Sequence, residues 1–255
     1  MANISFSDIA LEFDDLFEDV DRLTNLEGDA LDNILKPNNV ISVLDCACGT
    51  GIQSIGLSRR GYKVSASDIS VPMLSSLNNK ARQEGLDIEV KKADFRNLRP
   101  WKGRKFDAII SCGNSLTLLE SDIEIANSLT SMLSCLQSPG VGIIGIHNYL
   151  RVAEHKEHLF IRKTNLENEQ PEIIFDIRMF GKKRVKVSYF FLREQNHKWR
   201  LKTYTKSYLL LDANDLKDRM LNAGFDTVKL LDISGQRNFN NDDEWILAAG
   251  YIKNL

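Results

Sequence analysis

Long apolar runs, paired cysteines and a strong excess of either charge are all missing from this 255-residue sequence. No apolar run approaches the roughly 18 residues that a membrane-spanning helix needs. The N-terminus carries acidic residues where a secretory signal peptide would be basic and then apolar. The four cysteines include no Cys-x-x-Cys pair and suggest no disulfide framework. We therefore expect a cytoplasmic protein that has no membrane partner.

Charge and composition set further limits on the kind of protein. The formal net charge of −2 gives no overall attraction to nucleic acid or to an anionic membrane. Hydrophobic residues make up 43% and charged residues 27%, which is ordinary for a globular protein. No metal-ligand spacing and no strong nucleophile arrangement stands out, so no metal is expected. A chain of this length can form one large core with an inserted cap.

The most informative stretch is Val-Ile-Ser-Val-Leu-Asp-Cys-Ala-Cys-Gly-Thr-Gly, residues 40–51. Its apolar, β-branched start is typical of a strand that is buried on both faces. Gly49 and Gly51 then allow a tight turn and a close approach of the backbone to a ligand. Residues 52–60 carry apolar side chains on one side, as an amphipathic helix does. This order predicts a nucleotide-type pocket at the carboxyl end of a parallel strand.

The spacing of the glycines does not fit the dinucleotide fingerprint Gly-x-Gly-x-x-Gly, because Ala47 and Ile52 occupy two of its glycine positions. The pattern Asp45-x-Ala47-x-Gly49-x-Gly51 instead resembles motif I of the class I S-adenosylmethionine-dependent methyltransferases. The resemblance implies S-adenosyl-L-methionine as the cofactor and S-adenosyl-L-homocysteine as its product. It also implies that Asp45 acts at the methionine end of the cofactor. The alternative is a plain strand, turn and helix whose glycines serve geometry alone.

The next two predicted strands also lead into acids. Asp68 ends the second strand, where a carboxylate can accept both hydrogen bonds of a ribose diol, and Ile69 follows it into the expected cofactor site. Asp94 and Phe95 follow the third strand, where they could accept from the adenine amino group and stack near the ring. The methyltransferase resemblance implies the same roles for the two acids. Alternatively, Asp68 is a helix cap, although Ser70 is better placed for that, and Asp94 is a loop acid.

Residues 1–36 are predicted to be helical, because apolar side chains recur at three- and four-residue steps between Phe13 and Leu26. Such a helix could simply cover an edge of the sheet. Related methyltransferases often use this segment as a lid over the cofactor, with an arginine near the methionine carboxylate. Arg22 is the only basic residue before Lys36, which makes it the candidate for that role.

The fourth predicted strand runs into the loop Ser-Cys-Gly-Asn-Ser-Leu, residues 111–116. Cys112 lies where this strand opens toward the cofactor. The loop lacks the Asp/Asn-Pro-Pro-Tyr/Phe of adenine-N6 DNA methyltransferases, and Gly113-Asn114-Ser115 resembles the Gly-Asn-Ser-Phe of the glycine and sarcosine N-methyltransferases. That resemblance implies that Asn114 orients the substrate amine, and its side-chain carbonyl can accept from an amine. Alternatively, Asn114 is a turn residue or a cap.

The fifth predicted strand ends in His147-Asn148-Tyr149, where the resembled family reads His-Arg-Asn-Tyr. Aligning Asn148 and Tyr149 places His147 at the arginine that binds the substrate carboxylate in that family. An imidazole is a poor replacement for a bidentate guanidinium, so this departure counts against glycine itself as the substrate. His147 could serve as a base, as a hydrogen-bond donor or as a structural histidine at the strand end.

Between residues 151 and 211 the pattern changes to an alternation of period two, with hairpin turns expected at 181–183 and 195–197. This pattern predicts an antiparallel unit that is inserted before the last helix and caps the site. Tyr189 falls roughly where the resembled family has a substrate-facing tyrosine.

Other side chains of this unit leave two interpretations open. Tyr189, Tyr204 and Tyr208 could project into the site or could pack within the sheet. The numerous basic residues should mainly form a solvated face, the alternative being a patch for an anionic substrate or nucleic acid. They are Arg178, Lys182, Lys183, Arg184, Lys186, Arg193, Lys198, Arg200, Lys202 and Lys206.

These patterns predict an α/β fold of the class I methyltransferase type, Rossmann-like, with a mostly parallel seven-stranded sheet, helices on both faces and an inserted antiparallel β cap. The expected units are an N-terminal helical lid, 1–36; an S-adenosylmethionine-binding domain, 37–150 and 212–255; and a substrate cap, 151–211. The expected strands of the large sheet are 40–44, 63–67, 88–92, 106–111, 141–146, 228–233 and 245–251.

The expected function is methyl transfer from S-adenosylmethionine to a small molecule by direct in-line displacement, with an amine nitrogen as the favoured acceptor. Asn114, His147 and Tyr189 are the candidate catalytic residues. The alternatives are a methyltransferase of another acceptor, either an oxygen nucleophile or RNA, and a non-catalytic S-adenosylmethionine-binding protein. A small-molecule acceptor is the expected partner, nucleic acid is not expected, and the oligomeric state is left open.

Overall fold

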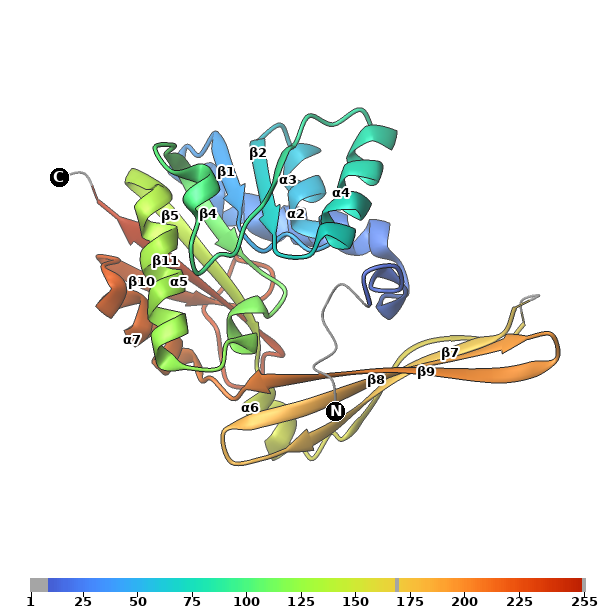
Figure 1. Cartoon of the computed structure of the whole chain (residues 1–255). Coiled ribbons are helices and arrows are strands. Elements are labelled where there is room, and N and C mark those ends of the chain that lie inside the picture. The colour runs from blue at the N-terminus through green and yellow to red at the C-terminus, as the bar shows by residue number, and fades with distance from the viewer. Residues whose placement is uncertain (1–8, 168–169, 254–255) are drawn as a thin grey trace.

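The computed structural model describes residues 9–167 and 170–253. These residues form a seven-stranded sheet and a separate four-stranded sheet, which lies beyond one end of the large sheet (Figure 1). In the large sheet, β1 to β5 are parallel, and β11 runs antiparallel to both β5 and β10. The strand order β10-β11-β5-β4-β1-β2-β3 confirms the predicted fold class. The strands are β1 (Ser42–Asp45), β2 (Lys63–Asp68), β3 (Glu89–Lys92), β4 (Phe106–Ser111), β5 (Leu136–His147), β10 (Thr227–Leu231) and β11 (Trp245–Ile252).

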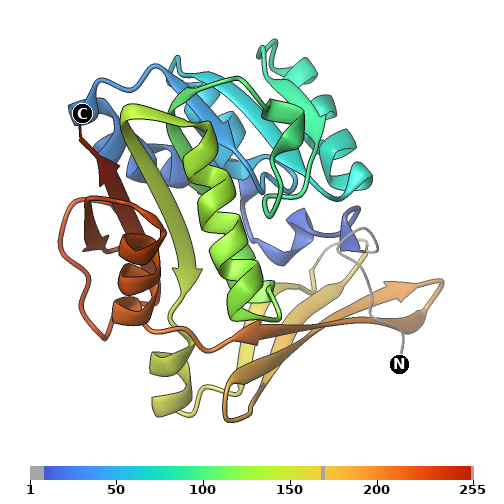
Figure 2. The ribbon, with the colours of Figure 1, turned by 60° about the vertical axis from the view of Figure 1, so that its left-hand side comes forward.

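Helices cover both faces of the large sheet. Successive side chains of each strand point to opposite faces, and both sets are buried under helices. Ile109 and Ile144 belong to the core that contains α5 and α7, which lie on the face seen in Figure 2. Ile110 and Ile143 belong to the core that contains α2 and α3 on the other face. The helices are α2 (Val20–Leu35), α3 (Ile52–Ser58), α4 (Val71–Gln83), α5 (Asp122–Cys135), α6 (Tyr149–Glu154) and α7 (Ala213–Ala223).

The first helix is shorter than the sequence predicts. A 3₁₀ turn, η1 (Asp14–Leu16), is followed by a break, and α2 begins only after Asp19, whose side chain accepts the N–H of Arg22. This cap starts a new helix, so the apolar spacing of Phe13, Leu16 and Phe17 belongs to a separate segment. The predicted helix also includes residues 1–8, which lie outside the described part of the chain.

Strand β5 is longer than the expected 141–146, because it begins at Leu136. Ser138, Pro139 and Gly140, which are residue types typical of a chain break, lie inside it. Leu136 pairs with Phe106 of β4 and Gly140 pairs with Ile252 of β11, so neighbours on both sides hold this stretch in the sheet. The Ser138 hydroxyl also donates to the Lys253 carbonyl oxygen at 2.6 Å. These partners are distant in sequence, which is why local turn signals gave the wrong boundary.

The four-stranded sheet is antiparallel, in the order β6-β7-β8-β9. Its strands are β6 (Leu159–Asn165), β7 (Glu172–Phe180), β8 (Arg184–Gln195) and β9 (Lys198–Leu209). Both predicted hairpin turns are confirmed. Strand β6 and helix α6 were not predicted. In β6 the alternation is interrupted by a register shift between Ile161 and Lys163, which obscures the strand signal in the sequence.

Segment 9–17 bridges the two sheets. Ile9 and Leu16 are buried in a core cluster with side chains of the four-stranded sheet. Asp14 accepts from the Thr50 hydroxyl at 2.6 Å and pairs with Lys80 of α4 at 2.8 Å. On the other side, Asp15 pairs with Arg193 of β8 at 2.6 Å. This segment therefore contacts both the loop after β1 and the small sheet.

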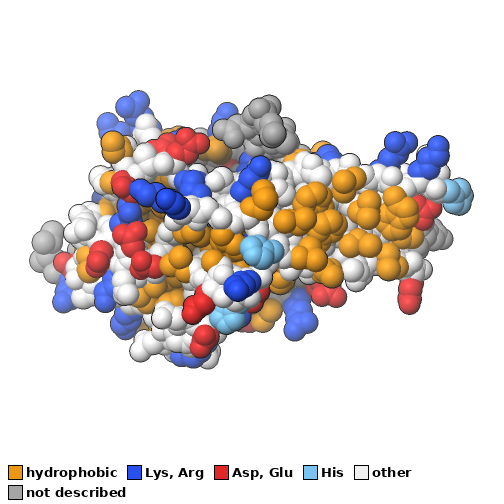
Figure 3. All heavy atoms as spheres, turned by 90° about the horizontal axis from the view of Figure 1, so that it is seen from below, with side chains coloured by type: hydrophobic (Ala, Val, Ile, Leu, Met, Phe, Trp, Pro, Cys, Tyr) orange, Lys and Arg blue, Asp and Glu red, His pale blue; other side chains and the backbone are white. Residues whose placement is uncertain are grey.

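The face of the small sheet that points away from the large sheet is apolar. Figure 3 shows hydrophobic side chains gathered over it, and they include the exposed Ile177, Met179 and Leu201. Phe175 and Phe190 stack there with ring centroids 4.8 Å apart. In the described residues, no helix is both long and apolar enough to cross a membrane.

Candidate active site

The turn after β1 lies over the carboxyl ends of three parallel strands. The Cys46 N–H donates to the Ile110 carbonyl of β4, and the Cys48 N–H donates to the Ser67 carbonyl of β2. Both glycines of the turn have positive φ, +52° at Gly49 and +95° at Gly51. A methyl group added at Gly51 would collide with Leu77 of α4, whereas one added at Gly49 would meet nothing within 4 Å. Gly51 therefore allows helix packing, and Gly49 is open to a ligand.

Asp45 lies beneath this turn and is almost completely buried. It accepts from the Ser54 hydroxyl at 2.7 Å and from the backbone N–H of Ala47, which fixes the turn to the start of α3. Burial raises the pKa of Asp45 to about 7, against the effect of these hydrogen bonds, and the nearby Asp68 raises it further. Asp45 is therefore close to the point at which it exchanges a proton near neutral pH.

Asp68 joins the turn to the end of β2. Its two carboxylate oxygens accept the backbone N–H groups of Gly49 at 3.0 Å and of Ser70 at 2.8 Å. The Ile69 backbone N–H also contributes a hydrogen bond to this carboxylate, and of its roughly four lone-pair positions one is left for a ligand hydroxyl group. Burial raises the pKa of Asp68, although the backbone N–H groups oppose the shift. Ser70 is the N-cap of α4, as its position in the sequence indicated.

The residues expected near the adenine ring lie in two different environments. Ile69 and Asp94 line one cavity of about 350 Å³, beside Ala93 and Asn97. Phe95 packs instead against the core around α5, and it does not line this cavity.

Asp94 already has a protein partner. The guanidinium group of Arg96 donates to this carboxylate, and the shortest distance, from Nη2 to Oδ2, is 2.6 Å. Burial alone would raise the pKa of Asp94, but the hydrogen bonds from Arg96 hold it below its usual value. Only the remaining lone pairs of this carboxylate could therefore accept from an adenine amino group.

The two further predicted cofactor residues lie in different surroundings, and the carboxylates of Glu27 and Asp45 help to raise the pKa of one of them, Cys112. Arg22 is exposed on α2. Cys112 is buried, and its side chain packs in the core against Gly145 of β5. The contact from the N-terminal part of the chain to the turn comes from Asp14, through Thr50.

Glu27 is a candidate that the sequence reasoning missed. It lies on α2 opposite the start of α3, where Gln53 donates to it at 3.5 Å. Burial raises its pKa, and its charge contributes to raising the pKa of Cys112 at the end of β4. An acid four residues before Leu31, on the buried side of α2, was the signal in the sequence. With Asp45 and Asp68, Glu27 makes this end of the sheet acidic, which suits a cationic ligand.

Asn114 and His147 lie side by side at the ends of β4 and β5. The Asn114 side-chain carbonyl accepts from the His147 backbone N–H at 3.1 Å. The Thr117 hydroxyl lies 2.8 Å from both the side-chain and the main-chain carbonyl oxygens of Asn114, and its single proton can go to either. At least one lone pair of the side-chain oxygen is therefore used within the protein, and its role toward a substrate amine stays a prediction. The side-chain NH₂ group of Asn114 offers a donor to a ligand. Asn114 is also a turn residue, with φ of +75°.

His147 is buried with its two ring nitrogens in different surroundings. Nε2 lies 3.3 Å from the Glu244 carboxylate, and Nδ1 is buried without a hydrogen-bond partner among the described residues. A carboxylate at Nε2 favours the tautomer with its proton there, which leaves Nδ1 as an acceptor. Burial lowers the pKa of His147 despite Glu244, so the ring is neutral at pH 7.

A row of buried rings leads from His147 into the small sheet. Tyr149 stacks on His147 with centroids 4.3 Å apart, and Tyr208 lies 5.5 Å from Tyr149. The hydroxyl groups of Tyr208 and Tyr189 are 2.9 Å apart. The three predicted tyrosines, Tyr189, Tyr204 and Tyr208, are thus buried in the small sheet. Tyr208 is linked to His147 through ring contacts, and Tyr189 joins Tyr208 through the hydroxyl groups.

Arg178 departs from the expectation that the basic cap residues are solvated. It is only 2% exposed and lies on the same face of β7 as Asp176, which is fully buried. The period-two spacing of these residues with Ile174 was the available signal, since the three must share one face of a strand.

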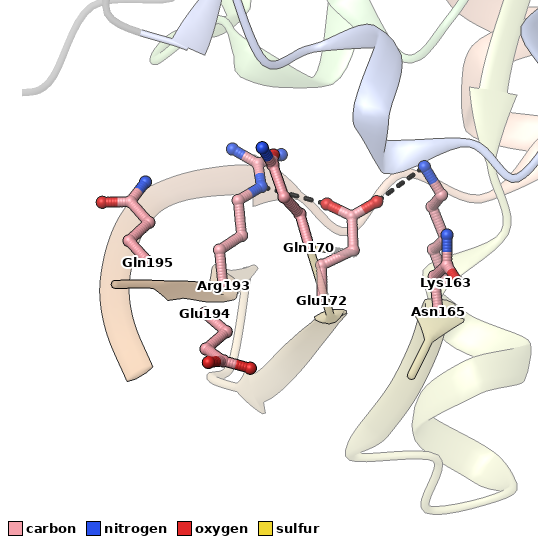
Figure 4. Close-up of a pocket in the computed structure, with 7 residues that line it drawn as sticks. All are labelled: Lys163, Asn165, Gln170, Glu172, Arg193, Glu194 and Gln195. Carbon is pink, nitrogen blue, oxygen red and sulfur yellow. Dashed lines mark hydrogen bonds and ion pairs between the residues drawn. The ribbon is translucent and has the colours of Figure 1, made fainter. Parts of the chain in front are cut away.

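A larger cavity, of about 580 Å³, lies within the small sheet. Figure 4 shows the carboxylate of Glu172 there, between Arg193 at 3.0 Å and Lys163 at 2.7 Å. Its lining contains none of the predicted site residues. Within the described chain, no group of three or more His, Cys, Asp or Glu residues is arranged to hold a metal ion.

Comparison with known proteins agrees with this geometry. Residues 43–140 match the family model described as "Methyltransferase domain". A glycine/sarcosine N-methyltransferase from Halorhodospira halochloris is 33% identical over 144 residues, which are 56% of this chain and 53% of that protein. Another from Parasynechococcus marenigrum is 35% identical over 128 residues, or 50% of this chain and 45% of that protein. This chain thus spans about half the length of the curated relatives that it matches.

Solved structures extend the likeness to the whole fold. An S-adenosylmethionine-dependent methyltransferase from Clostridium acetobutylicum has a TM-score of 0.75 and 20% identity, covering 97% of this chain and 98% of that one. The sugar N-methyltransferase KedS8 from Streptoalloteichus has a TM-score of 0.68 and 15% identity, covering 100% of this chain and 95% of that one. Residues 43–140 therefore match a methyltransferase domain, the chain has the class I methyltransferase fold, and its resemblance to the glycine/sarcosine N-methyltransferases is confirmed over about half its length.

Proposed function

We propose that this protein transfers the methyl group of S-adenosyl-L-methionine to an amine nitrogen of a small molecule. The observation that carries the proposal is the close placement of two sites. The open glycine turn, with Asp45 and Asp68, lies at the carboxyl ends of β1 and β2, and the buried pair Asn114 and His147 lies at the ends of the neighbouring β4 and β5.

The residues around the turn suit this cofactor. Asp68 would hold a ribose hydroxyl through its remaining lone pair, and the backbone at Gly49 allows the ligand to approach closely. The cavity beside Ile69 and Asp94 is the candidate adenine site. Asp45 and Glu27 would favour the ammonium group at the methionine end. When bound, the cofactor supplies an electrophilic methyl group on a sulfonium.

The work left to the chain is to position the amine and to accept its proton. The side-chain NH₂ group of Asn114 could donate to the acceptor molecule, because the His147 backbone N–H holds the carbonyl of the same amide in place. Neutral His147 offers Nδ1 as the proton acceptor, with Glu244 holding the ring through Nε2. The small sheet and segment 9–17 would exclude water from this space.

RNA as the acceptor is the weaker alternative. It would require one continuous basic surface beside the site, whereas the face of the small sheet in Figure 3 is mainly apolar. The basic side chains Arg178 and Arg193 are paired with acids.

A transfer assay with radiolabelled cofactor tests the proposal against amines, phenols and RNA. We expect label on an amine, and labelling of only phenols or RNA would contradict the amine acceptor.

Asn114→Ala should lower kcat while leaving the affinity for S-adenosylhomocysteine nearly unchanged. Asp68→Ala should weaken that affinity by about 1–3 kcal/mol, since it removes buried hydrogen-bond acceptors. The exposed Asp87→Ala is the matched control, with no change expected in either quantity.

A further inference from the structure

Two arginines and one aspartate share the buried face of the small sheet. The Asp176 carboxylate accepts from Nε of Arg178 at one oxygen and from Nε of Arg162 at the other, both at 2.8 Å. The two guanidinium groups also flank the ring of Phe160, at 5.0 and 5.1 Å from its centroid. The three charged groups therefore form one compact cluster.

The charges of this cluster do not balance. Two guanidinium groups share a single carboxylate, which leaves one net positive charge among these three groups, and the charge of Arg178 helps to lower the pKa of Glu244 beside His147. Arg178 is 2% exposed, and its Nη1 atom is buried without a hydrogen-bond partner among the described residues. Burying a charged donor that is only partly paired is unfavourable, so a fold that retains one needs another reason for it.

The cluster faces the end of β5. Arg162 lies 5.7 Å from the ring of Tyr189, whose hydroxyl group meets that of Tyr208, and ring contacts continue through Tyr149 to His147. The positive charges of both arginines also contribute to lowering the pKa of His147. The small sheet therefore brings two guanidinium groups toward the end of β5, where His147 lies.

We propose that Arg178, with Arg162 beside it, binds an anionic group at the far end of the amine acceptor. The acceptor is then a small amine that also carries a carboxylate or a phosphate. This inference rests on the proposed function. It makes Arg178, on strand β7, a residue that determines specificity.

The unfolding temperature separates a binding role of Arg178 from a purely structural one. Under the binding role, removing Arg178 leaves Arg162 and Asp176 as a neutral pair, so Arg178→Gln should unfold at the same temperature as the parent protein or higher. An arginine needed to satisfy Asp176 would give a lower unfolding temperature when replaced. Arg219→Gln is the matched control, because Arg219 pairs with two acids near the surface of α7, away from this cluster.

The test uses two pairs of amines that differ in charge, glycine against glycinamide and O-phosphoethanolamine against ethanolamine. The parent protein should prefer the anionic member of at least one pair, and which pair shows the preference tells carboxylate from phosphate. In Arg178→Gln, KM for that anionic amine should rise by about 30-fold or more, with little change for its neutral partner. Arg178→Lys should recover part of the loss.

Equal losses on charged and neutral amines, or no preference in the parent protein, would overturn the inference. A second readout does not depend on turnover. With S-adenosylhomocysteine bound, acetate or inorganic phosphate should raise the unfolding temperature of the parent protein and of Arg219→Gln, but not of Arg178→Gln. If no amine is methylated while this anion effect is present, the proposed function fails and the anion site stands. If amines are methylated without discrimination, only the anion site fails.

Discussion

At the scale of single residues, we expect Asp45 to couple ligand binding to the release of a proton. Burial raises its pKa to about 7, so near neutral pH a large fraction of the protein carries it uncharged. A cationic ligand at the glycine turn would lower this pKa, because an opposite charge favours the carboxylate. Asp45 must therefore lose its proton before its carboxylate attracts the cationic ligand in full.

We therefore predict that affinity for S-adenosylmethionine increases as the pH rises toward 7 and levels off above it. Isothermal titration calorimetry in two buffers of different ionisation enthalpy would show proton release on binding. Asp45→Asn should remove both the release and the pH dependence. A parent protein that binds equally well across this range would contradict the prediction.

His147 should leave a separate mark on the pH dependence of stability. Its folded-state pKa is below the ordinary value of 6.5, because burial opposes the imidazolium. The unfolded chain therefore takes up the proton first as the pH falls, and the contribution of this residue to stability, complete above pH 6.5, is lost as the pH falls toward the folded-state pKa.

Thermal unfolding between about pH 8 and pH 5 measures this effect. We expect His147→Gln to lose less stability than the parent protein over the acidic part of that range. His197→Gln, at a fully exposed histidine, is the control that should follow the parent. Parallel curves for His147→Gln and the parent would show that the histidine contributes nothing.

At the scale of elements, segment 9–17 is the piece that reaches the glycine turn. Asp14 accepts from Thr50 and pairs with Lys80, and both contacts are lost in Asp14→Ala. We predict a several-fold weaker affinity for S-adenosylhomocysteine and faster proteolysis within this segment, since its tie to the large sheet is broken. Limited proteolysis and calorimetry would measure the two effects. The exposed Glu18→Ala should change neither, and an unchanged Asp14→Ala protein would exclude a role for the segment in binding.

Elements that carry a local pattern could be predicted from the sequence. The glycine turn, the acids at Asp45 and Asp68, and the hairpins of the small sheet follow from spacing over a few residues. Strand β6 and the start of β5 could not, because their pairing partners lie far along the chain and their own patterns are interrupted.

The same limit applies to the candidate site. Asn114 and His147 were singled out separately, but the hydrogen bond between them depends on how β4 and β5 align. The pairing of Asp176 with both Arg162 and Arg178 needs two neighbouring strands in register, so composition alone suggested a solvated basic face.

At the scale of the whole molecule, one core cluster joins the parts. Met73 of α4, Leu16 of segment 9–17 and Val187 of β8 are buried together. We therefore predict a single cooperative unfolding transition by differential scanning calorimetry, shifted upward as a whole by S-adenosylhomocysteine. Two separate transitions, with only one of them responding to the ligand, would show that the small sheet folds independently.

The small sheet enters the chain as one continuous insertion between β5 and α7, whereas the glycine turn and the strands that support it are complete before the insertion begins. Under the proposed function, replacing the insertion would therefore change the methyl acceptor and leave the strands around the glycine turn in place. Exchange of residues 159–209 between relatives is then a practical route to new specificities.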